Sequence, residues 1–406
     1  SNTNLTIDMI AREALRLAHE KAAFISTTNR QFDSSWSNEG PTGDTLRIRY
    51  PSKYIRTQGS RVMDVQDSEQ LSTSLVRATQ DHVAMRLNSR ELALDMDGEQ
   101  GFSKLHLAPA MATLISGIES DYLQAMTKAT YNVAGTAGTA PSDLAAVGAA
   151  RAKLNQGLAP KDNNRCIQMD SVTMGSLVNG LKAVFNPPKE LSEQYREGFV
   201  TRTAMADFYE NERVFSLTNQ TSVAHTSGML NGPTLVNGLA TVTTATAGLP
   251  TVGAVFTVAG IFACHPETKA AYQSQQQFTV TATNSASTMT ISPSIYINGP
   301  RQNVCAASGA KLTSTSNVTS AAITWVGAAT TTYVHNLMYH RDAFTFATAD
   351  LPLMANAEKC VRKQYDGLSL RVWQDGDIRN DELLTRIDIL YGFAALRPEW
   401  ACRITS

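Results

Sequence analysis

The chain has 406 residues and a formal net charge of −1 at pH 7, which argues against a protein that holds nucleic acid by its own bulk charge. Its length allows two or three domains with sizeable cores. No window approaches the ~18 uninterrupted apolar residues of a membrane span, and Asp8, Arg12, Glu13 and Arg16 are incompatible with a secretory signal sequence.

The cysteines are scattered along the chain and contain no C-x-x-C pair. This pattern is typical of buried, reduced thiols in a cytoplasm rather than of a disulfide or metal framework. The five positions are Cys166, Cys264, Cys305, Cys360 and Cys402.

The N-terminal part predicts one helix and two strands. Residues Ile7–Phe24 have an amphipathic pattern, with Thr6 in the N-cap position. Residues 46–50 alternate apolar side chains with arginines, and residues 82–88 alternate apolar and polar side chains again. If these two strands pair, roughly thirty residues between them form a long excursion, and loops of that length usually have a function.

The charges of this excursion are separated along the chain. Basic residues come first and acidic residues follow, so the segment is either a solvated hairpin whose limbs neutralise each other or a polarised arm that docks on a neighbouring subunit. The candidate inter-subunit contacts are Arg47, Arg49, Lys53, Arg56 and Arg61 on the basic limb and Asp64, Asp67 and Glu69 on the acidic limb.

Two helices are predicted next. The first runs from about Pro109 to Tyr131, with a proline suited to the first turn and apolar residues at the spacing of a buried stripe. The second runs from Pro141 to about Gln156, where Gly157 supplies a C-terminal stop.

A short apolar strand is predicted over Arg165–Met169, and Asp170 or Ser171 caps a helix after it. The sequence Asn186-Pro187-Pro188 then breaks the chain, because proline cannot continue a helix.

Residues 219–333 carry almost no charge and consist largely of Thr, Ala, Ser, Gly and Val. Residues 278–283 and 289–292, on either side of a turn, alternate apolar side chains with threonine or serine. This pattern favours strands of a small sandwich or barrel. A disordered Ser/Thr linker is the alternative, but such linkers lack regularly placed large apolar residues. The charged residues of this stretch are Glu267, Lys269, Arg301 and Lys311.

The last segment, Leu384–Ile404, predicts partly buried strands. Ile387, Ile389 and Tyr391 alternate with Asp388 and Leu390.

No catalytic, cofactor-binding or metal site is predicted. His335 and His340 are five residues apart and therefore on opposite faces of a strand, which does not suit a metal site. Cys264 and His265 are neighbours whose side chains point apart, so they do not form a nucleophile–base pair. The acidic clusters at Asp95–Glu99 and around Asp375 lack the calcium-loop pattern and are better explained as turns.

The order of elements resembles the HK97-like fold of tailed-bacteriophage major capsid proteins, and more closely the P22-type coat proteins, which carry an inserted β-barrel. Three stretches carry the resemblance. They are Phe185–Gly198 with Arg213-Val214-Phe215, residues 253–261 with 278–280 and 290–293, and Arg386–Gly392 with Arg397-Pro398-Glu399.

The resemblance implies an α+β fold and a structural function without catalysis or cofactors. Such proteins assemble as hexamers and pentamers into an icosahedral procapsid in the bacterial cytoplasm and become part of the virion. Scaffolding protein, portal and packaged double-stranded DNA, bound without sequence specificity, are the implied partners, with no membrane. The alternative is a cellular nanocompartment shell of the same fold that encloses cargo protein.

The resemblance also implies a division of the chain. The expected parts are an N-terminal arm (1–43), an extended loop (44–92), a peripheral domain with the spine helix (93–140), the first part of an axial domain (141–218), an inserted β-barrel (219–335), a return segment (336–383) and C-terminal strands (384–406). One departure is the insertion's lack of charge, so any contact it makes with a neighbour must use apolar and hydroxyl groups.

Overall fold

The computed structural model describes most of the chain and divides it into two compact units. The described ranges are 7–31, 45–63, 65–88, 103–181, 206–219, 235–244, 250–284, 287–313, 321–354, 359–365 and 367–406. Unit 1 comprises Ser1–Ile48, Thr73–Tyr122 and Phe344–Leu396, and unit 2 comprises Arg49–Ser72, Leu123–Ala343 and Arg397–Ser406. Helices and several sheets confirm the α+β class.

Unit 1 contains a five-stranded antiparallel sheet and the N-terminal helices. The strands are β3 (Thr79–Asn88), β15 (Phe344–Ala349), β16 (Lys359–Tyr365), β17 (Leu368–Asp377) and β18 (Glu382–Ala395), and the helices are α1 (Ile7–Lys21), α2 (Ala23–Thr27) and the first part of α6 (Ala108–Ala129). The predicted helix over Ile7–Phe24 is confirmed for α1, but it ends at Lys21 and a separate helix, α2, begins at Ala23. Thr6 lies outside the described residues.

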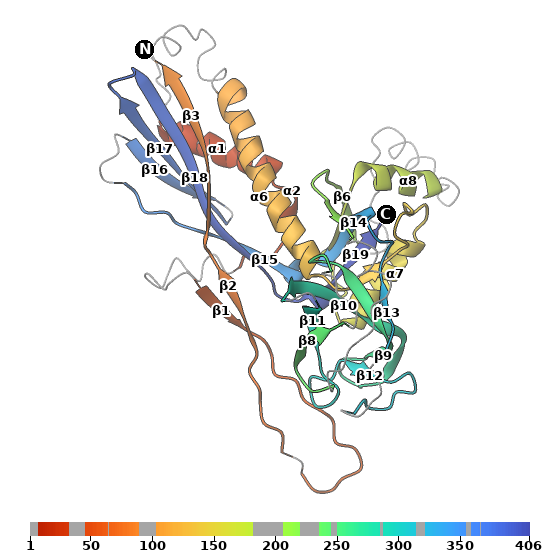
Figure 1. Cartoon of the computed structure of the whole chain (residues 1–406). Helices are drawn as coiled ribbons and strands as arrows, with labels where there is room; N and C mark the ends of the chain where they lie inside the picture. The colour runs from red at the N-terminus through yellow and green to blue at the C-terminus, as the bar shows by residue number, and fades with distance from the viewer. Residues whose placement is uncertain are drawn as a thin grey trace. The chain divides into compact units, whose positions relative to one another are not determined.

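The predicted pairing of the first two strands is wrong. The strand β1 (Thr45–Arg49) pairs with β2 (Ser72–Val76) instead. β3 forms a long antiparallel ladder with β18, from Glu382↔Asn88 to Tyr391↔Thr79 (Figure 1). Alternation alone does not specify which strand is the partner. β18 is longer than β1 and has a matching buried face, so β3 pairs with β18.

The core of unit 1 is aromatic. Tyr122 of α6 packs against Phe24, Phe346 and Phe393 at ring-centroid distances of 4.7, 5.4 and 5.2 Å. Buried Glu119, one turn earlier on α6, accepts the backbone N–H of Phe24 at 2.6 Å. The helix α6 therefore does more than supply apolar side chains to the core. It also places the Glu119 carboxylate where it caps the N-terminal end of α2.

The sequence analysis missed a buried ion pair in β18. Asp388 is fully buried and accepts hydrogen bonds from Arg371 at 2.7 Å and Arg386 at 2.6 Å. The alternation predicted Asp388 on the opposite face from buried Ile387 and Ile389, and that geometry is correct. The second face is nevertheless covered, so the charge requires partners.

Unit 2 contains a mixed sheet covered by two helices. Its strands are β4 (Val133–Ala134), β5 (Arg165–Met169), β6 (Asp207–Glu210), β7 (Phe215–Thr218), β14 (Thr332–His340) and β19 (Ala401–Thr405), and the helices are α7 (Ala145–Gln156) and α8 (Ser171–Leu181). Val147 and Leu154 of α7 and Leu177 of α8 pack on the sheet.

Three local predictions in this region are confirmed. β5 has the predicted bounds, Gly157 is the C-cap of α7, and the side chain of Asp170 accepts the N–H of Thr173 at 3.3 Å in the first turn of α8. The predicted break at Asn186-Pro187-Pro188 lies outside the described residues.

The charge-poor stretch forms a second, antiparallel sheet of unit 2. Its strands are β8 (Leu239–Thr243), β9 (Val255–Cys264), β10 (Ala271–Thr283), β11 (Thr288–Ile295), β12 (Val304–Cys305) and β13 (Ile323–Trp325), in the order β12-β9-β10-β11-β8 with β13 also on β9. Phe256, Phe278 and Trp325 lie at the centre of its core. The prediction of strands rather than a disordered linker is confirmed.

Candidate functional site

An extended loop, Tyr50–Leu71, joins β1 to β2 (Figure 1). Its limbs are connected near the base by a hydrogen bond from the Tyr50 N–H to the Leu71 carbonyl at 2.8 Å. Further along, the Gln66 side chain bonds both the N–H and the carbonyl of Ile55, at 2.8 and 2.6 Å. A glutamine amide carries the same donor and acceptor as a backbone peptide, and it therefore keeps the limbs together where no strand forms.

The candidate contact residues of this loop lie on its surface. The seven described members, Arg47, Arg49, Lys53, Arg56, Arg61, Asp67 and Glu69, are all exposed. Asp64 lies outside the described residues. The structure thus leaves these charges accessible, and it brings one of them, Glu69, into a specific contact.

Glu69 pairs with the charge-poor sheet of its own chain. Its carboxylate lies 3.2 Å from the guanidinium of Arg301, which also stacks over the Tyr296 ring at 4.1 Å. Among the described residues, none of the loop's basic side chains forms an ion pair with Asp67 or Glu69. Asp67 and Glu69, the described members of the acidic limb, therefore do not neutralise the basic limb.

The sequence analysis missed an apolar apex on the same loop. Val62, Met63 and Val65 are 79%, 82% and 75% exposed. Exposed apolar side chains gathered in one place are typical of surfaces that contact a partner. The available signal was the run Arg61–Val65, whose apolar residues sit in a loop otherwise rich in charge.

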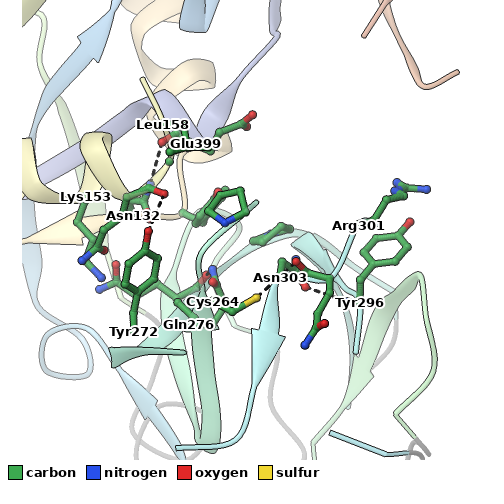
Figure 2. Close-up of a pocket in the computed structure, with 18 of the residues that line it drawn as sticks. Asn132, Lys153, Leu158, Cys264, Tyr272, Gln276, Tyr296, Arg301, Asn303 and Glu399 are labelled. Atoms are coloured by element: carbon green, nitrogen blue, oxygen red, sulfur yellow. Dashed lines mark hydrogen bonds between the residues drawn. The ribbon is translucent and has the colours of Figure 1, made fainter. Parts of the chain in front are cut away.

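A cavity of about 370 Å³ lies beside the base of this loop within unit 2. Lys53 and Leu71 of the loop, the end of α7, strands β9 and β10, and the segment Arg397–Trp400 contribute to its walls. Figure 2 shows Lys153, Asn132 and Tyr272 on one side and Arg301 with Tyr296 on the other.

Two charged groups that line the cavity, Lys153 and Glu399, have shifted pKa values. Burial lowers the pKa of Lys153, and burial raises the pKa of Glu399 although Arg397 and Lys53 oppose that shift. The Arg397 guanidinium is 3.9 Å from the Glu399 carboxylate and lies over the Trp400 ring at 4.5 Å. Both shifts reflect charges held in a partly desolvated space.

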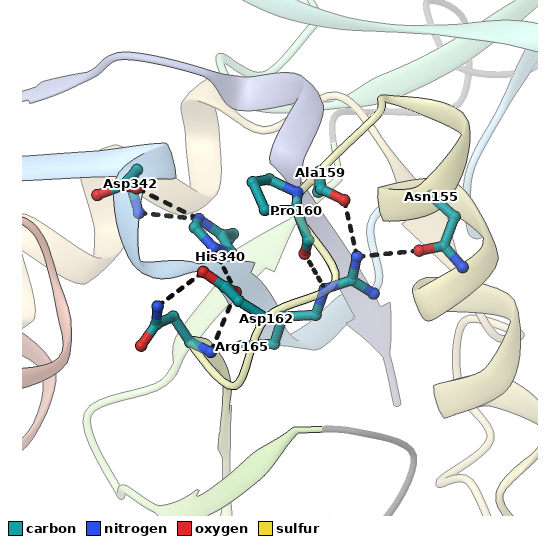
Figure 3. Close-up of polar contacts among 8 residues, drawn as sticks. Asn155, Ala159, Pro160, Asp162, Arg165, His340 and Asp342 are labelled. Atoms are coloured by element: carbon teal, nitrogen blue, oxygen red, sulfur yellow. Dashed lines mark hydrogen bonds and ion pairs between the residues drawn. The ribbon is translucent and has the colours of Figure 1, made fainter.

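The histidines and the aspartates of β14 and its neighbours have structural roles. The His340 ring accepts the Asp342 N–H at 3.2 Å through Nδ1, and its Nε2 lies 2.9 Å from Asp162 (Figure 3). His335 is buried, and burial together with Arg403 lowers its pKa to about 3, so it is neutral at pH 7. No group of metal-ligating side chains occurs within the described ranges.

The other chemical candidates are also accounted for. Burial raises the pKa of Cys264 to about 11, so its thiol is protonated, and His265 accepts backbone N–H groups of a turn. Asp375 accepts the N–H of Gly376 near the end of β17 at 3.0 Å, and Asp377 accepts the N–H of Arg379 in the β17–β18 connection at 2.9 Å. The cluster Asp95–Glu99 lies outside the described residues.

None of the helices in the described ranges is both long and apolar enough to span a bilayer.

Residues 236–403 match a protein family described as "P22 coat protein - gene protein 5". The match begins just before β8 and ends in β19, so it covers both the charge-poor sheet and the C-terminal strands. These include two of the three stretches on which the resemblance was based. Over these residues the match supports the predicted resemblance to P22-type coat proteins, and the helices and sheets of the described residues agree with the predicted α+β class.

Comparison with solved structures gives broad but distant similarity. The chain is similar to a structure from Mycobacterium phage Che8 (9% identity, covering 94% of this chain and 90% of that chain, TM-score 0.49). It is also similar to the capsid of Ralstonia phage GP4 (7%, 90% and 83%, 0.45) and to a virus-like particle from Pyrococcus furiosus (7%, 98% and 98%, 0.40). Because these TM-scores are low, the assignment depends on the family match. No curated protein matches the chain.

Proposed function

We propose that this chain, whose residues 236–403 match the P22 coat-protein family, is a structural protein of a phage capsid that assembles as hexamers and pentamers into an icosahedral head around double-stranded DNA. Assembly takes place in the host bacterial cytoplasm with a scaffolding protein and a portal. The work of the chain is subunit association rather than catalysis. The family match over two structurally distinct sheets is the observation that carries the proposal.

The extended loop is the part of the subunit that we assign to contacts with a neighbour. Its basic residues Arg56 and Arg61 are exposed, and its apolar apex at Val62 and Met63 is unburied within the chain. Apolar surface supplies affinity when it is buried between subunits, and complementary charge sets the orientation. The loop offers both, which suits an arm laid across an adjacent subunit.

The near-neutral net charge of −1 is compatible with a DNA container. A shell that does not neutralise the phosphates itself leaves that task to cations and polyamines. The predicted inserted domain, residues 219–335, then stabilises the subunit and meets its neighbours through hydroxyl and apolar groups.

Negative-stain electron microscopy of the chain, expressed alone and with its neighbouring genes, tests this function. Closed shells of uniform size, or aberrant tubes and spirals without a scaffold, support it. Nuclease-protected DNA inside shells purified from infected cells supports the phage head, whereas enclosed cargo protein without DNA would identify a nanocompartment shell. A small, monodisperse oligomer under every condition would refute both.

A further inference from the structure

The cavity beside the loop base contains cations that the chain itself does not neutralise. Four basic side chains line it, and Glu399 is the one acidic residue among the described lining residues. Arg301 is paired with Glu69 outside the cavity, and Arg397 lies nearest to Glu399. The two remaining cations are Lys53 at the rim and Lys153 in the wall.

Lys153 is the more informative of the two. It lies in the last turn of α7, and its side chain is partly buried. Within the described part of the chain, no hydrogen bond or ion pair of its ammonium group is found. A partly desolvated ammonium without a carboxylate costs stability, so its presence in a cavity wall points to an anionic partner from outside the chain.

The lining also contains amide side chains that form no hydrogen bond with the described part of the chain. Asn132 and Gln277 are committed to backbone groups of Ala401 and Val133, whereas Gln156 and Gln275, within the described residues, form no side-chain hydrogen bond. Each free amide has both a donor and an acceptor, which matches a peptide bond. A phosphodiester has no hydrogen-bond donor for the amide carbonyls, whereas a peptide bond supplies both a donor and an acceptor.

The placement of the cations indicates an extended ligand. The two unpaired cations come from different elements of the lining, Lys53 from the loop and Lys153 from the last turn of α7, and Figure 2 shows Lys153 on the opposite side of the cavity from Arg301. The volume of about 370 Å³ is at the lower end of the range for ligand pockets, which suits a few peptide residues.

We propose that this cavity binds a short acidic segment of another polypeptide, with a carboxylate of the segment placed on Lys153 and a second near Lys53. The segment's backbone then bonds the free amides of Gln156 and Gln275. This inference does not depend on the geometry of a shell, and it is tested on the unassembled subunit, so it can fail while the assembly proposal stands.

The test is isothermal titration calorimetry of the full-length unassembled subunit at low ionic strength with a capped penta-glutamate peptide. We expect binding by the unmodified chain and a loss of affinity of about 10-fold in Lys153→Gln, equivalent to about 1.4 kcal/mol. Lys161→Gln is the matched control, because Lys161 is an exposed lysine of the same unit outside the cavity. It should change affinity by less than about twofold.

Three comparisons make the test decisive. Lys153→Gln should melt at or above the temperature of the unmodified chain, because it removes an unpaired, desolvated cation; a large loss of thermal stability would mean a structural role and refute the proposal. Lys53→Gln, at the exposed rim, should weaken peptide binding by about threefold. Absence of peptide binding, equal losses in Lys153→Gln and Lys161→Gln, or stronger binding of inorganic phosphate or of penta-thymidylate would each overturn the acidic-peptide assignment.

Discussion

Replacing Asp388 by asparagine tests whether the buried ion pair organises the unit 1 sheet. The change keeps the shape of the side chain and removes its charge, and it leaves Arg371, whose side chain is only 4% exposed, without a carboxylate. Arg371 retains one hydrogen bond, to the Pro352 carbonyl at 2.8 Å. Removing one partner of a buried pair costs about 3–5 kcal/mol, mostly because the other charge is stranded.

Urea unfolding of the unassembled subunit, followed by hydrogen exchange of peptides from β17 and β18, measures this cost locally. The exchange-derived opening free energy of these strands should fall by about 3–5 kcal/mol in Asp388→Asn. The double variant Arg371→Gln/Asp388→Asn should lose less than Asp388→Asn alone, because no charge is then stranded. A loss below about 1 kcal/mol in the single variant would refute the reasoning.

Three further predictions concern pH, packing and assembly. Burial would raise the pKa of Asp388, but Arg371 and Arg386 hold it below the usual 3.8; its contribution is therefore present above pH 3.8 and lost as pH falls through the lowered pKa, so acid titration should destabilise the unmodified chain more than Asp388→Asn. Gly392→Ala would place a Cβ 2.0 Å from the Val76 carbonyl and should cost at least about 2 kcal/mol in urea unfolding, whereas an unchanged midpoint would contradict that contact. Charge reversal in the loop, in the double variant Arg56→Glu/Arg61→Glu, should give folded subunits whose assembly, followed by light scattering, is poor. Assembly of the unmodified chain should weaken with salt. Normal shells from the double variant would rule out electrostatic docking.

Local elements were predictable because they depend on local chemistry. The strand β5, the C-cap Gly157 and the capping side chain of Asp170 follow from short-range rules that tertiary packing did not override. The helix α6 was predictable for the same reason, since it combines a first-turn proline with a continuous apolar stripe.

Partners across long sequence separations were not predictable. β3 pairs with β18 about three hundred residues later, and no alternation pattern specifies which of several strands supplies the matching edge. The Glu69–Arg301 pair has the same character. The sequence analysis identified both residues, one as part of a polarised limb and one as a rare charge in a neutral stretch, but gave no reason to join them.

The buried guanidinium of Arg403 connects parts of unit 2 that lie far apart in the sequence. It donates to the carbonyls of Thr130 and Lys128 at the end of α6, at 2.7 and 3.1 Å, and to the Gly253 carbonyl and the Thr279 hydroxyl of the charge-poor sheet, at 2.6 and 3.1 Å. Burial lowers its pKa to about 9, so it stays charged at pH 7.

All these acceptors of Arg403 are neutral oxygens, and two of them belong to the C-terminal end of a helix, where the dipole favours a cation. A sheet almost without charged residues is therefore joined to the end of α6 by a charge that the C-terminal strand β19 supplies. Because one guanidinium serves the helix end and the sheet together, a displacement of either would leave hydrogen bonds of a buried cation unmade. The sheet and the end of the helix are consequently expected to move as one body whenever the subunit adjusts to its neighbours.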